Sequence, residues 1–242
     1  MRPSKCFSAT VAVMTCLGGC SGGGSGSSAT TYDYAAPQLN SQRTYTRTIV
    51  DNAKNTINQT IVDTVTAVNN DGSSVVESED PTHNFITVDG TNYSVPTEIA
   101  NENNSGQETS YTETSTDGSA LTCTLTPHGA GPGYPAAVGE SWSSSWNVSC
   151  GNSTPIHYTQ TGTIVDTESI TVPAGTFTAF KLQSTISWTN AEGTTYTDSR
   201  ITWRDVHSSH AVIEEQDTYV LSGTMPTNGY PATTITVLQQ ES

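Results

Sequence analysis

The sequence predicts an all-β protein, and three observations support this class. The 242-residue chain contains 42 threonines and 29 serines, while hydrophobic residues make up 33% and charged residues 13%. Threonine is β-branched and suits a strand with one exposed face, whereas a helix rich in serine and threonine would be weak. Apolar and polar residues alternate along most of the chain after residue 40, and no amphipathic helix of ordinary length is apparent there.

Residues 1–19 predict a signal peptide. Arg2 and Lys5 supply a positive start, and the apolar stretch from Phe7 to Leu17 is too short to span a bilayer. The next residues complete Leu17-Gly18-Gly19-Cys20, which resembles the lipobox of bacterial lipoproteins. The resemblance implies cleavage before Cys20, acylation of its thiol, and a membrane partner reached through these acyl chains. A plain secretory signal with a chance cysteine is the alternative.

The residues after Cys20 predict a flexible tether. Residues 20–40 begin with a Gly/Ser run that cannot bury apolar area. Ser21 follows the lipobox cysteine, and the enterobacterial sorting pattern implies the outer membrane when this position is not Asp. Residues 41–242 are then expected to form a single β domain.

The body of the chain consists of alternating stretches separated by turn residues. In Thr56–Val68 the alternation places Ile57, Ile61, Val65 and Ala67 on one face. Two Asp-Gly pairs, at 89–90 and 117–118, predict hairpins. The predicted strands are 43–50, 56–68, 73–79, 83–88, 92–95, 107–116, 119–126, 140–150, 156–172, 176–188, 194–203, 211–222 and 232–238. So many strands joined by short turns predict an antiparallel sheet that must curl, split into a sandwich, or close.

Two cysteines of the body are expected to form a disulfide. Cys6 and Cys16 leave with the signal and Cys20 carries lipid, so Cys123 and Cys150 remain as an even pair in an oxidising compartment. Alternation places both thiols on the apolar faces of their strands. Neither belongs to a Cys-x-x-Cys pair, which favours a structural bridge over a metal or redox role.

Three segments resemble those of uncharacterised, β-rich cell-envelope proteins. These are Val138-Gly139-Glu140-Ser141-Trp142, Val172-Pro173-Ala174-Gly175-Thr176-Phe177 and Ile201-Thr202-Trp203. The resemblance covers about residues 138–222 and implies a long antiparallel meander, curved into a half-barrel or open barrel, with a β-sandwich as the alternative. No enzyme activity comes with it. The sequence departs from the pattern at residues 204–210, where an uncharged turn is usual.

The charge of the chain excludes one class of partner. Eight lysines and arginines face 23 aspartates and glutamates, for a formal net charge of −15. Such a chain should be repelled by nucleic acid and by anionic lipid surfaces, so that membrane attachment would have to be covalent.

No catalytic residues, cofactor or enzyme class are predicted. The sequence holds no nucleophile elbow, phosphate-binding loop or zinc-protease motif, and no spacing selects one carboxylate pair among many. Asp205, His207 and His210 are the best candidate metal ligands. The two histidines would point to opposite faces of a strand, so an exposed loop without metal is expected instead.

Four tryptophans suggest one ligand site. Trp142, Trp146, Trp188 and Trp203 all fall on predicted strands and could line an apolar cavity in a curled sheet, although filling the core is favoured. Three functions remain open. The first is an outer-membrane lipoprotein with a non-enzymatic binding or structural β domain, the second a carrier of a lipid or other hydrophobic ligand, and the third a hydrolase with an unrecognised carboxylate site.

Overall fold

The structure, a computed structural model, describes residues 31–81, 85–88, 91–94, 97–114, 118–129, 131–207, 211–225 and 230–242. These residues form strands and connecting turns, without a helix. In the described part, therefore, no helix is long and apolar enough to cross a membrane. Cys20 and its lipobox lie outside the described residues, so the predicted signal, acylation and domain limits stay predictions.

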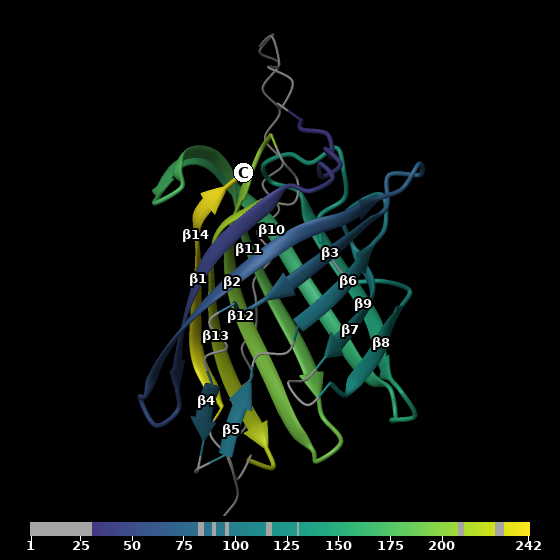
Figure 1. The fold of residues 1–242 in the computed structure, drawn as a ribbon, viewed down its shortest axis with the longest axis vertical. Coiled ribbons are helices and arrows are strands. Elements are labelled where there is room, and N and C mark those ends of the chain that lie inside the picture. Colours follow the sequence, from purple (N-terminus) through teal and green to yellow (C-terminus); the bar gives the residue numbers. More distant parts are fainter. Residues whose placement is uncertain are drawn as a thin grey trace, which may run out of the picture.

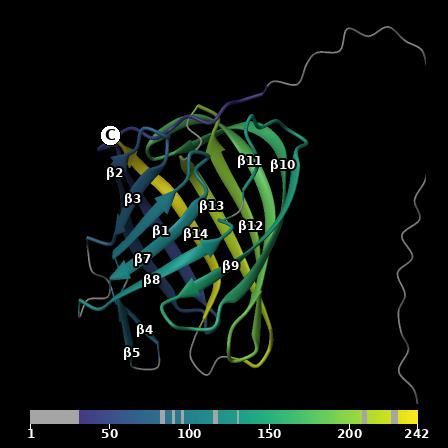
Figure 2. The same cartoon turned by 90° about the vertical axis from the view of Figure 1, so that its right-hand side faces the viewer.

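Twelve of the described strands form one closed antiparallel barrel (Figures 1 and 2). The strands are β1 (Gln42–Asp51), β2 (Thr56–Val68), β3 (Ser74–Glu79), β4 (Phe85–Val88), β5 (Thr91–Ser94), β6 (Thr97–Glu102), β7 (Glu108–Thr114), β8 (Ala120–Thr126), β9 (Ser141–Cys150), β10 (Ile156–Val172), β11 (Gly175–Thr189), β12 (Thr194–Asp205), β13 (Val212–Gly223) and β14 (Pro231–Glu241). The strands β4 and β5, which follow β3 and precede β6 in the chain, pair with each other as a separate two-stranded sheet.

The predicted all-β class and its barrel form are confirmed, and the sheet closes beyond the expected half-barrel or open barrel. Closure comes from β1, which pairs with β2 on one side and with the last strand, β14, on the other. Residues such as Arg47 and Thr236 are partners in this seam. Because first and last strands meet, the twelve strands leave no unpaired edge for another chain to extend.

One strand, β6, is not predicted by alternation. Its inward positions carry Glu98, Ala100 and Glu102, while Ile99 points outward and is 38% exposed. The pattern is therefore inverted relative to an ordinary half-buried strand, in which the inward face is apolar. Charged residues on the inner face are the first sign that the barrel interior is more than a packed core.

The Val172–Phe177 motif forms the tip of the longest hairpin. Strands β10 and β11 extend past the barrel wall and curl over at its upper end, the end at which the C-terminus lies in Figure 1. Val172 packs in one apolar cluster with Trp203, Ala211 and Ile213, and Phe177 lies against it. The motif is thus explained by packing of the hairpin tip.

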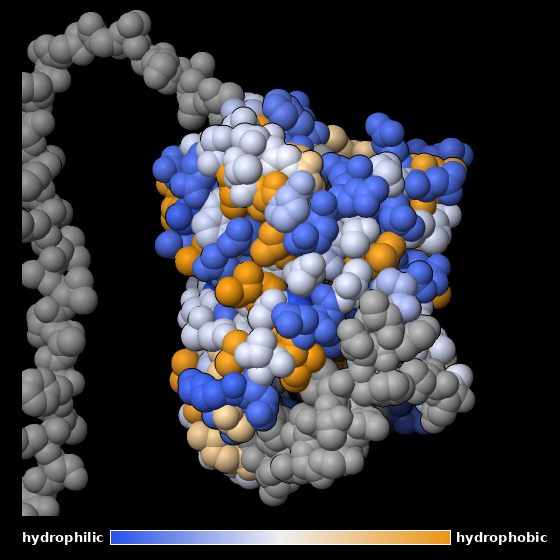
Figure 3. Space-filling model, turned by 60° about the vertical axis from the view of Figure 1, so that its left-hand side comes forward, coloured by the Kyte–Doolittle hydropathy of each residue, from blue (hydrophilic) through white to orange (hydrophobic). Residues whose placement is uncertain are grey.

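The outer face of the barrel is polar, which accounts for the threonine content. Hydroxyl groups on neighbouring strands hydrogen-bond one another, as in the pairs Thr112–Thr122, Ser141–Thr163 and Thr189–Thr195, each at 2.9 Å. On the face shown in Figure 3, apolar side chains are scattered among polar ones. Such cross-strand pairs stabilise a sheet whose outer surface has little apolar area to bury.

The predicted disulfide is present. Cys123 of β8 lies directly opposite Cys150 of β9, and their sulfur atoms are bonded. Cys123 is buried in an apolar cluster with Leu125, Trp146 and Val148. The bridge therefore fixes the register of two strands and anchors one of the inner clusters.

Gly162 allows Trp142 to lie flat against the barrel wall. The two residues are partners on β10 and β9, and a Cβ atom at position 162 would overlap the indole ring. The indole also packs against a cluster that contains Ile164, Phe180 and Leu182. A glycine is required here because the ring occupies the space of a side chain.

Loss of the disulfide should lower stability without changing the fold. The chain-entropy estimate for closing a loop of this length is about 3.5 kcal/mol. In a domain of this size that corresponds to a fall in melting temperature of roughly 10 °C for Cys123→Ser. Thermal melts of the wild type and the variant measure this. An unchanged melting temperature, or two free thiols in wild-type protein from an oxidising compartment, would contradict the assignment.

Gly162→Ala should destabilise the barrel by forcing the Trp142 indole away from the wall. Overpacking of this kind costs about 1–3 kcal/mol. Urea unfolding measures the loss, and the same substitution in a Trp142→Leu background provides the control, since the clash is then absent. Equal losses in both backgrounds would show that the contact with Trp142 is not the cause.

Candidate ligand-binding lumen

The barrel contains a cavity of about 600 Å³, and charged side chains make up a large minority of its lining. Four arginines and seven carboxylates reach it, together with apolar side chains that include Ile61, Leu125 and Ile186. The charged lining residues are Arg43, Arg47, Arg200, Arg204, Asp63, Glu79, Glu98, Glu102, Glu108, Glu113 and Glu215. This lumen is the candidate site, since it combines an enclosed volume with convergent polar groups.

Alternation along the strands explains how the charges reach the interior. In β12, Asp198, Arg200, Thr202 and Arg204 share the inner face, whereas Trp203 lies on the other side of the sheet. Because side chains alternate with a period of two, a strand that carries charges at every second position directs them all to one face.

Arg200 holds together three carboxylates. Its Nε lies 2.7 Å from Asp217 Oδ1, Nη2 lies 3.0 Å from Asp198 Oδ2, and Nη1 lies 3.6 Å from Glu215 Oε2. One positive charge cannot compensate three negative ones. Burial, and next the nearby Glu215, raise the pKa of Asp217, so this group retains a proton more readily than an exposed aspartate.

A second group of carboxylates lies on β2, β6 and β7. We call Asp63, Glu98, Glu102, Glu108 and Glu113 the acidic wall. Its residues all line the cavity, and Glu98 lies directly opposite Glu113 in the pairing of β6 with β7. Ser78 donates a hydrogen bond to Asp63 at 2.7 Å, and Ser74 donates one to Glu102 at 2.9 Å.

Burial and mutual repulsion raise the pKa values of four carboxyl groups in the acidic wall. Burial, followed by the charges of Glu98, Glu102 and Glu113, raises the pKa of Glu108 to about 7. Burial is also the main reason why the pKa values of Asp63, Glu98 and Glu102 are raised. Near neutral pH Glu108 is therefore divided between its protonated and ionised forms.

Several buried polar atoms around the lumen have no hydrogen-bond partner among the described residues. One of them, Arg47 Nε, is a donor. Three others, Ser144 Oγ, Gln160 Oε1 and Asp198 Oδ1, can accept hydrogen bonds. These three residues lie in one row across the sheet, since Gln160 of β10 pairs with Ser144 of β9 and with Ile186 of β11, which in turn pairs with Asp198 of β12. We call them the acceptor row. Buried acceptors without donors are costly unless water or a ligand supplies them.

The four tryptophans do not line one apolar cavity. Trp146 and Trp188 belong to a ladder of stacked rings that runs Trp146, Tyr158, Trp188, Tyr196 across β9 to β12, with ring centroids 4.9–5.5 Å apart. The rings are stacked with their faces toward one another, at about the spacing of neighbouring strands. The ladder therefore links four adjacent strands of the wall through side-chain contacts.

The other two tryptophans fill packed clusters. Trp142 covers Gly162, as described above. Trp203 is buried beneath the curled hairpin, where its indole N–H donates to Glu168 and Lys181 lies 5.1 Å from its ring centre. Of the four, Trp146 contributes to the lining of the lumen.

Two of the predicted metal candidates, Asp205 and His207, do not line the lumen. The backbone N–H of His207 donates to Asp205 Oδ1 at 3.3 Å, and the imidazole of His207 is exposed. His210 lies outside the described residues. Among the residues that the structure does describe, no three His, Cys, Asp or Glu side chains are grouped as metal ligands would be. The expectation that this loop binds no metal stays a prediction.

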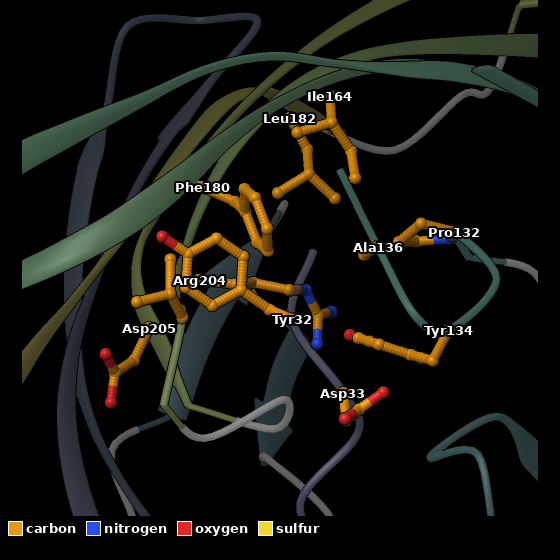
Figure 4. Close-up of a pocket in the computed structure, with 11 residues that line it drawn as sticks. Tyr32, Asp33, Pro132, Tyr134, Ala136, Ile164, Phe180, Leu182, Arg204 and Asp205 are labelled. Carbon is orange, nitrogen blue, oxygen red and sulfur yellow. The ribbon is translucent and has the colours of Figure 1, made fainter. Parts of the chain in front are cut away.

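The upper end of the barrel is covered by the segment that precedes β1. Tyr32 exchanges two backbone hydrogen bonds with Ala136, at 3.0 and 2.8 Å, and its ring meets Phe180 edge to face (Figure 4). Tyr34 contacts Tyr134, with ring centroids 5.5 Å apart. Pro37 and Ser41 continue the segment and line the lumen. The described end of the predicted tether therefore lies along the barrel rim.

The sequence offered a weak signal for the acidic wall. Glu98 and Glu102 are spaced as inward residues of a strand, but acids normally face solvent, and the same spacing is ordinary on an exposed strand. The assignment of these residues, and of Gln160, to an interior required the closed barrel.

Comparisons with known protein families and with curated proteins found no match to this chain. Among solved structures, the chain resembles an inferred exported protein with a YmcC-like fold from Bacteroides fragilis NCTC 9343, with a TM-score of 0.51 and 11% identity over 88% of this chain and 100% of that one. An inferred lipoprotein from Parabacteroides distasonis ATCC 8503 gives a TM-score of 0.47 and 14% identity over 88% and 99% of the two chains. At these identities the likeness concerns the fold alone.

Acidification from pH 8 to pH 5 should stabilise the barrel. A carboxyl group whose pKa is raised in the folded state binds its proton more tightly there, and this stabilises the fold at low pH. For Glu108 the gain in the free energy of unfolding is complete below the unfolded pKa of 4.5 and is lost as the pH rises through about 7. Hydrogen bonds from Asn55 and Ser73 lower the pKa values of Asp51 and Asp71, so these two groups change the stability only at pH values below the interval from 5 to 8. Urea midpoints at several pH values measure the slope.

Glu108→Gln should reduce this pH dependence, because glutamine stays neutral throughout. The matched control is Glu192→Gln, which changes an exposed turn residue and should keep the wild-type slope. A wild-type midpoint that stays constant or rises between pH 5 and pH 8 would contradict the assignment of raised pKa values.

Proposed function

We propose that this protein is a lipoprotein of the outer membrane, anchored through Cys20, whose barrel binds a polar ligand in its lumen without catalysis. The observation that carries the binding role is the charged cavity of about 600 Å³ within a closed barrel. A barrel of purely structural use would be expected to fill its interior with packed apolar side chains.

Anchoring is supported by the sequence around Cys20. The segment Leu17-Gly18-Gly19-Cys20 joins a short apolar signal to a Gly/Ser run, as in bacterial lipoproteins. The disulfide between Cys123 and Cys150 is typical of proteins that fold outside the cytoplasm. The similar structure from Bacteroides fragilis is that of an inferred exported protein, which agrees with the same compartment.

The lining of the lumen favours a polar ligand over a lipid. An acyl chain in this cavity would remove water from arginines and carboxylates without replacing their hydrogen bonds, which is costly. Of the four tryptophans considered for a lipid site, two are stacked against tyrosines and two are buried in packed clusters, and only Trp146 is among the described residues that line the lumen. The carrier hypothesis is therefore retained for polar ligands rather than for hydrophobic ones.

The opposed glutamates Glu98 and Glu113 are the observation that would favour a hydrolase. In glycoside hydrolases the two carboxyl groups flank the scissile bond. Here both side chains come from adjacent strands of one wall, so they would approach a bound ligand from the same side. This placement suits a binding surface for positive charge better than a pair of catalytic acids.

Cys20→Ala should release the protein from membranes. Without the thiol no diacylglyceryl group can be attached, and an acidic chain has no other strong attraction for a lipid surface. Detergent phase separation and the intact mass measure anchoring and acylation, and membrane fractionation tests the outer-membrane location.

Cys16→Ala is the matched control, because Cys16 lies within the predicted signal and should leave acylation intact. Wild-type protein that enters the aqueous phase and lacks acyl mass would overturn the anchoring proposal.

A further inference from the structure

Carboxylates of the acidic wall lie opposite one another on the inner face. Asp63 of β2 pairs with Ser78 of β3, Ser78 pairs with Glu98 of β6, and Glu98 pairs with Glu113 of β7. Like charges directly across a sheet are destabilising. The chain thus places negative charge where folding alone would disfavour it.

The arginines of the lumen neutralise this wall only in part. Arg43 forms an ion pair with Glu241 at 2.8 Å, and Arg200 is bound by the three carboxylates described above. Arg47 offsets part of the rise in the pKa of Asp63 and Glu98, and Arg43 and Arg204 do the same for Glu102. Among the described residues, however, no ion pair within 4 Å joins Glu98, Glu108 or Glu113 to a basic group. The wall retains an excess of negative charge.

Gln160 provides an independent observation. Its side chain is 7% exposed, lines the same cavity and carries an oxygen, Oε1, with no donor among the described residues. Ser144 and Asp198 extend this acceptor row on either side. Arg47 Nε, on the opposite side of the charge balance, is a buried donor without a partner among the described residues, so the unmet need for a donor is specific to Gln160 and its row rather than general to the lumen.

Apolar side chains occupy the cavity together with these two sets of polar groups. Ile61, Leu125, Trp146 and Ile186 all contribute to the lining. They offer contact for hydrocarbon between charged or hydrogen-bonding ends. A single metal ion makes no use of such a surface, and its carboxylate ligands would have to converge on one point.

From this combination we propose that the lumen binds an alkyl polyamine, with ammonium groups toward the acidic wall, N–H donors toward Gln160, and methylene groups against the apolar lining. The inference rests on the proposed binding role of the barrel and names the chemical class of its ligand. Several N–H donors on a positively charged chain supply positive charge to the acidic wall and a hydrogen-bond donor to Gln160.

Titration of spermidine into the purified full-length protein in a non-ionic detergent tests the proposal. Calorimetry gives the dissociation constant, and the fluorescence of Trp146 within the lumen gives a second signal. We expect saturable binding with one set of sites. The double variant Glu98→Gln with Glu113→Gln should weaken binding at least tenfold, and Gln160→Leu should weaken it several-fold.

The control is the double variant Glu77→Gln with Glu192→Gln. It makes the same change in net charge on the outer face of β3 and in an exposed turn, so spermidine binding should match that of the wild type. Removal of opposed charges should leave the lumen variant at least as stable as the wild type, which a thermal melt establishes before binding is compared.

Three outcomes would overturn the proposal. They are no saturable binding, an equal loss of affinity in the lumen and control variants, and displacement of spermidine by Mg²⁺ or Ca²⁺ at the same charge concentration. Each leaves the anchoring result untouched, because phase separation and acyl mass do not depend on the lumen. Loss of anchoring with spermidine binding retained would overturn the lipoprotein assignment alone.

Discussion

The pairing of β1 with β14 is the interaction on which the rest of the structure depends. It joins residues nearly 200 positions apart, as in the ion pair between Arg43 and Glu241, and turns a meander into a closed wall. Once the wall is closed, every inward side chain must be satisfied by other inward side chains, by water or by a ligand. Charges that water would solvate on an open sheet then interact with one another inside the barrel.

Apolar packing and charge occupy different parts of this interior. The cluster around Ile164, Phe180 and Leu182 supports the upper end with Tyr32 and Ala136, and the cluster around Cys123 and Trp146 lies against the aromatic ladder. Only 33% of the residues are hydrophobic, and these clusters bury part of that limited set. Rigid surroundings hold the acidic wall and the acceptor row in place despite their repulsion.

Sequence patterns predicted those parts of the fold in which local chemistry and the final environment agree. The hairpin of β10 and β11, the inward direction of Ile61 and Val65 on β2, and the bridge between Cys123 and Cys150 all follow from alternation and cysteine placement. The strand β6 did not, because its acids face inward only after the barrel has closed. For the same reason four tryptophans could not be assigned to a ladder or a cluster, since strand alternation fixes a face but not which rings meet across it.

The docking of Tyr32 on Ala136 fixes the direction in which the chain leaves the barrel. The same segment, through Pro37 and Ser41, forms part of the wall of the lumen, so attachment point and cavity share one end of the molecule. With acylation at Cys20, a flexible tether of the predicted kind from Ser21 to Thr31 would reach roughly 20 Å. The covered end of the barrel would then lie within that distance of the lipid headgroups, which would keep the lumen close to the bilayer surface.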